Sequence, residues 1–347
     1  MFAETMSKFR LPLILLALSI IVFIVLGFSV NLIVNTEIFQ PPTPQRATPD
    51  SRVTPLPVVV LATSPNDQRE PAVDGSTVVW AEKINGRWQI VRYDFVKRTK
   101  QQITNDNIDH IHPAVSGSII VWLENDQVAS FNLATNTKTI LGKAKKIAKP
   151  KVDGTLVVWL GESAKSDPLY APIILFDLKT QKSETLAKSQ FAKSPAVSGN
   201  VVVWEDWRDG NGDIYGYDVS SKQEFAIAKT ADDQISPAVA ANTAVWIDNR
   251  NTKSLSEVDL YGYDLKNKSE FQISVGRKDV VVDPRVSGTQ VVWSSNVQVF
   301  AFDLKTNKLR ALTSPGQRNI EPAISGNTVV WTRLTPAPAQ IVLGVVQ

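Results

Sequence analysis

The feature that most constrains this chain is a repeated spacing of proline and tryptophan. A proline is followed two residues later by valine or isoleucine, and nine residues later by tryptophan, at seven places. The seven pairs are Pro71/Trp80, Pro113/Trp122, Pro150/Trp159, Pro195/Trp204, Pro237/Trp246, Pro284/Trp293 and Pro322/Trp331. Successive prolines lie 37 to 47 residues apart, which is the length of one supersecondary unit. The spacing therefore predicts a repeat protein.

Each repeat has the pattern of a small β-sheet. In the fourth repeat, Val201–Trp204 is a β-branched run typical of a buried strand, residues 209–213 favour a turn, and Ile214–Asp218 form a returning strand. We expect four strands per repeat, the first following the proline and the second ending on the tryptophan. Helical repeats would need apolar residues at 3.6-residue spacing, but the repeats contain β-branched runs and turn clusters instead. The pattern predicts an all-β, seven-bladed β-propeller over residues 58–347.

The two ends of the repeat region predict how the ring closes. The seventh repeat ends after its third strand, whereas residues 58–63 before the first repeat have the pattern of a fourth strand without a blade of its own. Pairing residues 58–63 with residues 341–346 completes the last blade from both termini and leaves no orphan edge.

The N-terminal region has a different composition. Residues 11–34 are 24 residues without a charge, and as a helix they extend about 36 Å, more than the roughly 30 Å of a bilayer core. Lys8 and Arg10 in the short tail 1–10 place the N-terminus in the cytoplasm by the positive-inside rule. We expect a single-pass transmembrane signal anchor, a Pro-rich linker at 35–57, and a propeller outside the cytoplasm. A cleaved signal peptide and a buried core helix are the alternatives.

Composition excludes several kinds of chemistry. The net charge of +3 is too small to indicate a nucleic-acid partner. The chain has no cysteine, so disulfides and thiolate catalysis are excluded, and its two histidines argue against a His-rich metal centre. No Gly-x-Ser-x-Gly motif is present, so the hydrolase domain of a propeller peptidase is not expected. We expect no cofactor and no metal.

The repeat resembles those of TolB-like β-propellers. It is similar above all to tandem surface-protein repeats of the form PAVSGN-VVW-DxRxGNxDIYxYDL, which residues 195–218 match almost throughout. Residues 237–265 match with a longer insert, and the other repeats keep the proline and the tryptophan. The resemblance implies a propeller over residues 58–347 and implies little about function.

Candidate binding residues come from two positions of the repeat. The residues before the repeat prolines should surround one mouth of the central channel, and they are Glu70, His112, Lys149, Ser194, Ser236, Asp283 and Glu321. The loops between the second and third strands add Trp207, Arg208 and Arg250 on the same face. We expect Asp206 and Asp248, and the arginines two residues later, to pair locally or with a neighbouring blade.

Two metal hypotheses stay open as alternatives. The loop at residues 206–213 has spaced oxygen ligands as calcium loops do, although a turn explains it as well. His110 and His112 alternate in an extended segment, which places both imidazoles on one side where a metal could use them.

These observations lead us to expect a non-enzymatic binding or scaffolding module at the cell envelope, with an envelope protein or glycan as partner. The alternative is a carbohydrate-active or other hydrolytic propeller that uses carboxylates at the channel mouth, because two carboxylates from distant blades leave no sequence signature.

Overall fold

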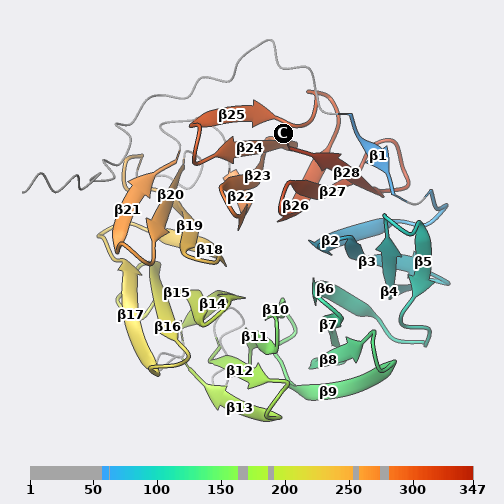
Figure 1. Cartoon of the computed structure of the whole chain (residues 1–347), viewed down its shortest axis with the longest axis horizontal. Coiled ribbons are helices and arrows are strands. Elements are labelled where there is room, and N and C mark those ends of the chain that lie inside the picture. Colours follow the sequence, from blue (N-terminus) through green and yellow to red (C-terminus); the bar gives the residue numbers. More distant parts are fainter. Residues whose placement is uncertain are drawn as a thin grey trace, which may run out of the picture. The chain divides into compact units, whose positions relative to one another are not determined.

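The computed structural model describes residues 57–61, 63–162, 171–186, 191–252, 258–273 and 281–346. These residues form seven four-stranded sheets, arranged as blades around a central channel (Figure 1). The prediction of an all-β, seven-bladed propeller is therefore confirmed. The tail 1–10, the expected transmembrane segment 11–34 and the linker up to residue 56 lie outside the described residues. Within the described part of the chain, no helix is long and apolar enough to cross a bilayer.

The first three blades follow the chain directly, each with its innermost strand first. Blade 1 contains β2 (Gln68–Asp74), β3 (Thr77–Ile84), β4 (Arg87–Asp94) and β5 (Thr99–Gln102). Blade 2 contains β6 (His110–Ser116), β7 (Ile119–Glu124), β8 (Gln127–Asn132) and β9 (Thr137–Lys143). Blade 3 contains β10 (Lys151–Asp153), β11 (Leu156–Leu160), β12 (Ile173–Asp177) and β13 (Lys182–Thr185).

The remaining blades continue the same order. Blade 4 contains β14 (Ala192–Ser198), β15 (Val201–Asp206), β16 (Asp213–Asp218) and β17 (Gln223–Ala228). Blade 5 contains β18 (Gln234–Ala240), β19 (Thr243–Asp248), β20 (Asp259–Asp264) and β21 (Ser269–Gln272). Blade 6 contains β22 (Val281–Ser287), β23 (Gln290–Ser295), β24 (Gln298–Asp303) and β25 (Lys308–Ala311). Blade 7 contains β26 (Asn319–Ser325), β27 (Thr328–Arg333), β28 (Gln340–Val345) and, as its outer strand, β1 (Val59–Val60).

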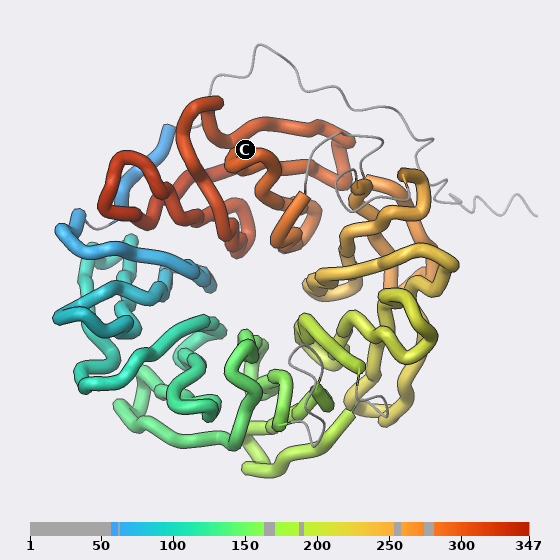
Figure 2. Tube along the Cα trace, turned by 180° about the vertical axis from the view of Figure 1, so that it is seen from behind, coloured from blue at the N-terminus to red at the C-terminus, as the bar shows by residue number. Residues whose placement is uncertain are grey.

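The ring closes as expected, through strands from both ends of the repeat region. β1 pairs antiparallel with β28, with Val59 opposite Leu343 and Val60 opposite Val342. The N–H of Leu61 continues the ladder by donating to the carbonyl of Ile341 at 3.0 Å. Figure 2 shows the blue N-terminal segment beside the red C-terminal blade. Blade 7 therefore has four strands, like its neighbours.

The innermost strands differ from the expectation in one respect: the strand does not begin after the proline. In six blades the proline lies inside the innermost strand, at a β-bulge such as the one between Lys193 and Ala196 in β14. A proline cannot donate to the ladder, and a bulge residue is left unpaired, so the bulge accommodates the proline at no cost in ladder hydrogen bonds. Only β10 begins after its proline and pairs without a register shift.

The repeat tryptophans form the packing core between neighbouring blades. All seven are at most 1% exposed. In four repeats the indole N–H donates to a carboxylate two residues later, as from Trp204 to Asp206 at 2.9 Å and from Trp246 to Asp248 at 3.0 Å. Truncating a buried tryptophan typically costs about 3–5 kcal/mol, so these residues are explained by blade construction.

Candidate functional site

The residues before the repeat prolines gather at the central channel, where the repeat register places them. Two adjoining cavities of about 220 and 300 Å³ occupy this region, and together their walls include all seven of these residues. We call the smaller the central cavity and the larger the side cavity. The central cavity includes Glu70, His112 and Glu321 of blades 1, 2 and 7, and the side cavity includes Ser194 and Ser236.

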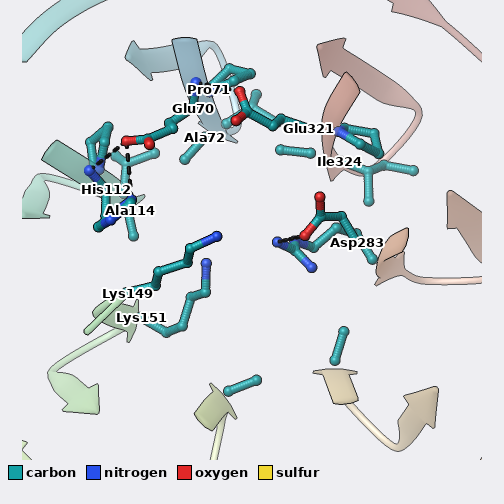
Figure 3. A pocket seen from close by; sticks show the side chains of 18 of the residues that line it. Glu70, Pro71, Ala72, His112, Ala114, Lys149, Lys151, Asp283, Glu321 and Ile324 are labelled. Atoms are coloured by element: carbon teal, nitrogen blue, oxygen red, sulfur yellow. Dashed lines mark hydrogen bonds and ion pairs between the residues drawn. The ribbon is translucent and has the colours of Figure 1, made fainter. Parts of the chain in front are cut away.

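A relay of hydrogen bonds crosses three blades on one side of the central cavity. The carboxylate of Glu321 accepts the backbone N–H of Glu70 at 2.8 Å and the hydroxyl of Thr332 at 2.9 Å. The carboxylate of Glu70 in turn accepts the backbone N–H of His112 at 2.8 Å and lies 3.1 Å from its Nδ1 (Figure 3).

The bulge geometry explains this relay. Glu70, His112 and Glu321 have φ near +55°, a conformation that points an unpaired N–H away from the ladder. For Glu70 and His112 the preceding blade supplies the acceptor, through the carboxylates of Glu321 and Glu70 respectively. Burial raises the pKa of Glu70, but the hydrogen bonds and charge of His112 outweigh it and hold that pKa below its usual value. Glu70 is therefore an ionised partner that orients His112, and it is poorly suited to act as a general acid.

Cations occupy the other side of the central cavity. Figure 3 shows the side chains of Lys149 and Lys151 extending toward its centre, opposite Asp283. Arg285 also contributes to the wall, and its Nη2 lies 3.8 Å from Oδ1 of Asp283. Desolvation, followed by repulsion from Arg285 and Lys149, lowers the pKa of Lys151 to about 7. A lysine in this state exchanges a proton at neutral pH, which an ordinary lysine does not.

Lys151 and Arg285 are the functional candidates that the sequence reasoning missed. Each directly follows a repeat proline, at a position where the other five repeats carry alanine. Those five alanines also lie on the wall of the channel or beside it. The sequence did contain a signal for these two candidates, because each is a charged residue at a repeat position that otherwise carries alanine and faces the channel.

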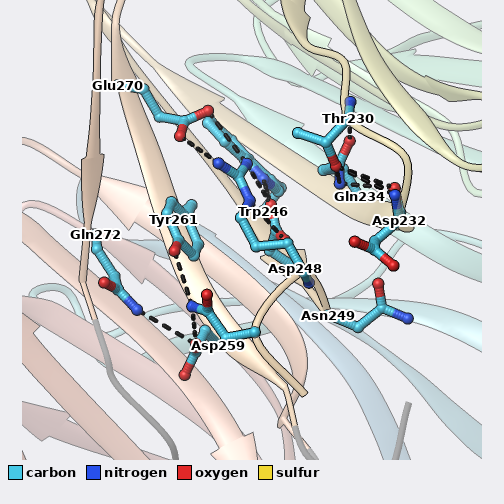
Figure 4. Close-up of polar contacts among 12 residues, drawn as sticks. Thr230, Asp232, Gln234, Trp246, Asp248, Asn249, Asp259, Tyr261, Glu270 and Gln272 are labelled. Atoms are coloured by element: carbon cyan, nitrogen blue, oxygen red, sulfur yellow. Dashed lines mark hydrogen bonds and ion pairs between the residues drawn. The ribbon is translucent and has the colours of Figure 1, made fainter. Parts of the chain in front are cut away.

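The loop residues predicted for the same binding face have structural partners instead. Arg250 bridges Asp248 at 2.6 Å and Glu270 at 2.6 Å (Figure 4), and its guanidinium lies 4.2 Å from the ring centre of Tyr261. Arg208 makes the corresponding bridges to Asp206 and Glu224. The predicted local Asp–Arg pairing is confirmed, and neither arginine lines the two channel cavities.

Trp207 lies beside Lys193 and Glu205 and is not itself on the wall of either channel cavity. Its indole N–H donates to Oε1 of Glu205 at 2.6 Å, and the Nζ of Lys193 lies 4.7 Å from its ring centre. Glu205 is buried and also accepts the backbone N–H of Ser236 at 3.0 Å. Lys193, which lines the side cavity, therefore links Trp207 to the channel.

The two histidines do not form a shared site. His110 is fully buried between blades, with Nε2 2.8 Å from Asp106 and Nδ1 2.8 Å from Glu124, while His112 lines the channel and contacts Glu70. In the suggested calcium loop, Asp206 binds Arg208 and Asp209 binds Lys229 at 2.7 Å. Among the residues that the structure describes, no three His, Asp or Glu side chains are grouped to hold a metal ion.

Comparison with solved structures shows the fold, at low sequence identity. An oligogalacturonate lyase from Vibrio parahaemolyticus is similar with a TM-score of 0.65 and 10% identity over 87% of this chain and 96% of that one. The β-propeller domain of the Trilobed protease from Pyrococcus furiosus gives a TM-score of 0.66 and 14% identity over 80% and 93%. No family model and no curated protein matches the sequence. The resemblance to TolB-like repeats therefore stays a prediction.

The comparisons contradict the expectation of a non-enzymatic protein. The two solved structures compared above are an enzyme and an enzyme domain, and the acylaminoacyl peptidase of Pyrococcus horikoshii is also similar, with a TM-score of 0.61 and 14% identity. The peptidase match covers 80% of this chain but only 51% of the peptidase, whereas the lyase match covers almost the whole lyase. The expectation rested on the absence of a catalytic motif, and a site built from distant blades would leave no such motif in the sequence.

Proposed function

We propose that the protein is a carbohydrate-active enzyme that cleaves an acidic sugar chain at the central cavity. The observation that carries this proposal is the convergence of Lys149 and Lys151 from blade 3, Arg285 from blade 6 and the His112–Glu70 pair on the central cavity. Cations at this position suit an anionic substrate, and the low pKa of Lys151 suits proton transfer at neutral pH. Oligogalacturonate lyases share the fold, and their name indicates that they act on such a substrate.

The residues present suit elimination better than hydrolysis. A carboxylate pair that hydrolyses glycosides needs one carboxyl group with a raised pKa, whereas the pKa of Glu70 is lowered and Glu321 accepts two hydrogen bonds within the chain. Elimination instead needs a base near a proton that is α to the sugar carboxylate, together with cations that stabilise the charge developing there.

The proposed step uses residues from three blades. Lys149 and Arg285 bind the sugar carboxylate, and the neutral amine of Lys151 takes the α proton. The electron pair of that C–H bond forms a C=C bond, and the C–O bond to the leaving sugar breaks. His112, paired with Glu70, gives its proton to the leaving oxygen. One of the matched lyases is a manganese complex, but the described residues of this chain offer no metal cluster, so no step is assigned to a metal.

The test is an assay for cleavage of trigalacturonate at neutral pH, followed by the ultraviolet absorbance of the conjugated C=C bond. We expect Lys151→Met and Lys151→Arg to lose at least about 100-fold in kcat/KM, because neither side chain accepts a proton at this pH. Lys222→Met is the matched control, since Lys222 pairs with Glu184 on the outer surface. New reducing ends without ultraviolet absorbance would contradict elimination, and absence of any cleavage would contradict the proposal as a whole.

A further inference from the structure

The side cavity has the composition of a second binding site for negative charge. Its walls include Lys149, Lys151, Lys193 and Arg285, against one carboxylate, Asp283. The central cavity is balanced by comparison, because Glu70 and Glu321 add two further carboxylates. The cations Lys149, Lys151 and Arg285 are therefore shared by both cavities, whereas Glu70 and Glu321 of blades 1 and 7 line the central cavity alone.

Lys193 is the charged residue that belongs to the side cavity alone. It comes from β14, and two contacts position its side chain. Its Nζ lies 3.6 Å from Oε1 of Glu205 and 4.7 Å from the ring centre of Trp207. Glu205 is itself anchored by the N–H of Ser236. Lys193 is thus preorganised at the cavity wall, which lowers the entropic cost of using it to bind a ligand.

Apolar surfaces complete the side cavity. Ile147 and Leu160 from blade 3 and its entry loop, with Pro195 and Pro237, line it beside the cations. A sugar ring presents C–H faces and charged or hydroxyl edges, so a wall that mixes apolar surface with a few polar groups fits such a ring. The hydroxyl-bearing residues Ser194 and Ser236 also line this cavity.

We propose that the side cavity is a second subsite, which binds the next acidic sugar of a chain whose first acidic unit occupies the central cavity. This inference rests on the proposed function and specifies its substrate as an oligomer of at least two acidic units. The carboxylates Glu70 and Glu321 repel a further anionic unit on the opposite side. The chain therefore extends from the central cavity toward blades 3 to 5 and ends at blades 7 and 1.

Binding is measured separately from cleavage. At about pH 5.5 uronate carboxyl groups are ionised and Lys151 is protonated, so calorimetric titration of the full chain reports binding without turnover. We expect digalacturonate to bind at least about 10-fold more tightly than monogalacturonate, which corresponds to about 1.4 kcal/mol. Maltose, which is neutral, should bind more weakly than digalacturonate by a similar factor or more.

Variants of Lys193 identify the subsite. Lys193→Gln should bring the affinities for monogalacturonate and digalacturonate to within about 2-fold of each other, with the affinity for monogalacturonate unchanged. Lys193→Arg keeps the positive charge and should keep the wild-type difference between the two ligands. Lys222→Gln serves as the surface control. Equal wild-type affinity for both uronates would overturn the inference, as would an equal loss for both in Lys193→Gln. Length-dependent binding without cleavage at neutral pH would support the subsite and reject only the catalytic proposal.

Discussion

The backbone N–H of Ala241 donates a hydrogen bond of 3.0 Å to the hydroxyl oxygen of Ser198 in the preceding blade. Five other blade junctions have the same bond, from the turn glycine after an innermost strand to an Asp or Ser of the blade before it. They join Gly75 to Ser325, Gly117 to Asp74, Gly154 to Ser116, Gly199 to Asp153, and Gly326 to Ser287. At the junction of blades 5 and 6 the residue at the acceptor position is Ala240, whose side chain cannot accept a hydrogen bond.

Introducing the missing acceptor should stabilise the ring. We expect Ala240→Ser to raise the free energy of unfolding by about 0.5–1 kcal/mol, the net value of one such hydrogen bond. Urea denaturation followed by tryptophan fluorescence measures it. Ser198→Ala, which removes an existing bond of the same kind, is the matched comparison and should lower stability by a similar amount. A stabilisation in Ser198→Ala would show that these bonds do not contribute.

The turn at Ala241 tests backbone strain independently of that acceptor. Ala241 has φ of +48°, a left-handed conformation that the corresponding residues of the other blades adopt as glycine. Ala241→Gly keeps the donating N–H and should stabilise the protein by about 0.5–1 kcal/mol. The reverse change, Gly199→Ala, should destabilise the protein by a similar amount. An added Cβ at Gly199 meets nothing within 4 Å, so the left-handed backbone conformation is the only source of strain. Thermal denaturation of both variants measures these two changes in stability.

Lys151 should cost the protein stability. Its pKa in the folded protein is about 7, against an ordinary 10.5, because of desolvation and then repulsion from Arg285 and Lys149. The unfolded chain therefore binds more protons between pH 7 and 10.5, so stability rises with pH across this window. We expect Lys151→Met to be about 1–3 kcal/mol more stable at pH 7 while losing activity. If unfolding of the variant and the wild type has the same pH dependence from 7 to 10.5, Lys151 has an ordinary pKa.

Glu124 should make the opposite contribution at acid pH. Burial raises its pKa, but hydrogen bonds from His110, Lys138 and Trp122 outweigh this and lower it from 4.5 to about 2. The ionised form therefore stabilises the folded state above pH 4.5, and that contribution is lost as the pH falls toward 2. Glu124→Gln should be about 1–3 kcal/mol less stable at pH 7 and show a shallower loss below pH 4.5. Urea midpoints across this pH range provide the measurement, and parallel curves would argue against the assignment.

The anchor at residues 11–34 remains a prediction from the sequence. We expect the full chain to stay with the membrane fraction after an alkaline wash, and a chain starting at residue 57 to remain in the supernatant, because about 20 apolar residues are needed to span a bilayer. Protease added to intact cells with permeable outer layers should digest the propeller and spare residues 1–10. Release of the full chain by the wash would contradict a transmembrane anchor.

Blade number could be predicted because it depends on local pattern, and ring closure could be predicted because the last repeat lacks an outer strand that residues 58–63 can supply. The spacing from Pro195 to Trp204 recurs in register, and each recurrence specifies a strand–turn–strand unit whose partners are close in sequence. The position of Glu70, His112 and the other residues before the prolines at the channel mouth follows from the same register. The bulges were not predicted, because a bulge is a feature of pairing between two strands and not of one strand alone.

The sequence by itself determined a seven-bladed ring and the set of positions that face its channel. Only the tertiary structure decided which of those positions act together, because Lys151, Arg285 and His112 come from blades that are up to 173 residues apart in the chain. The low pKa of Lys151 arises from that convergence, through desolvation and the charges of Arg285 and Lys149. Electrostatic coupling depends on distance in space, and no spacing along the chain reports it.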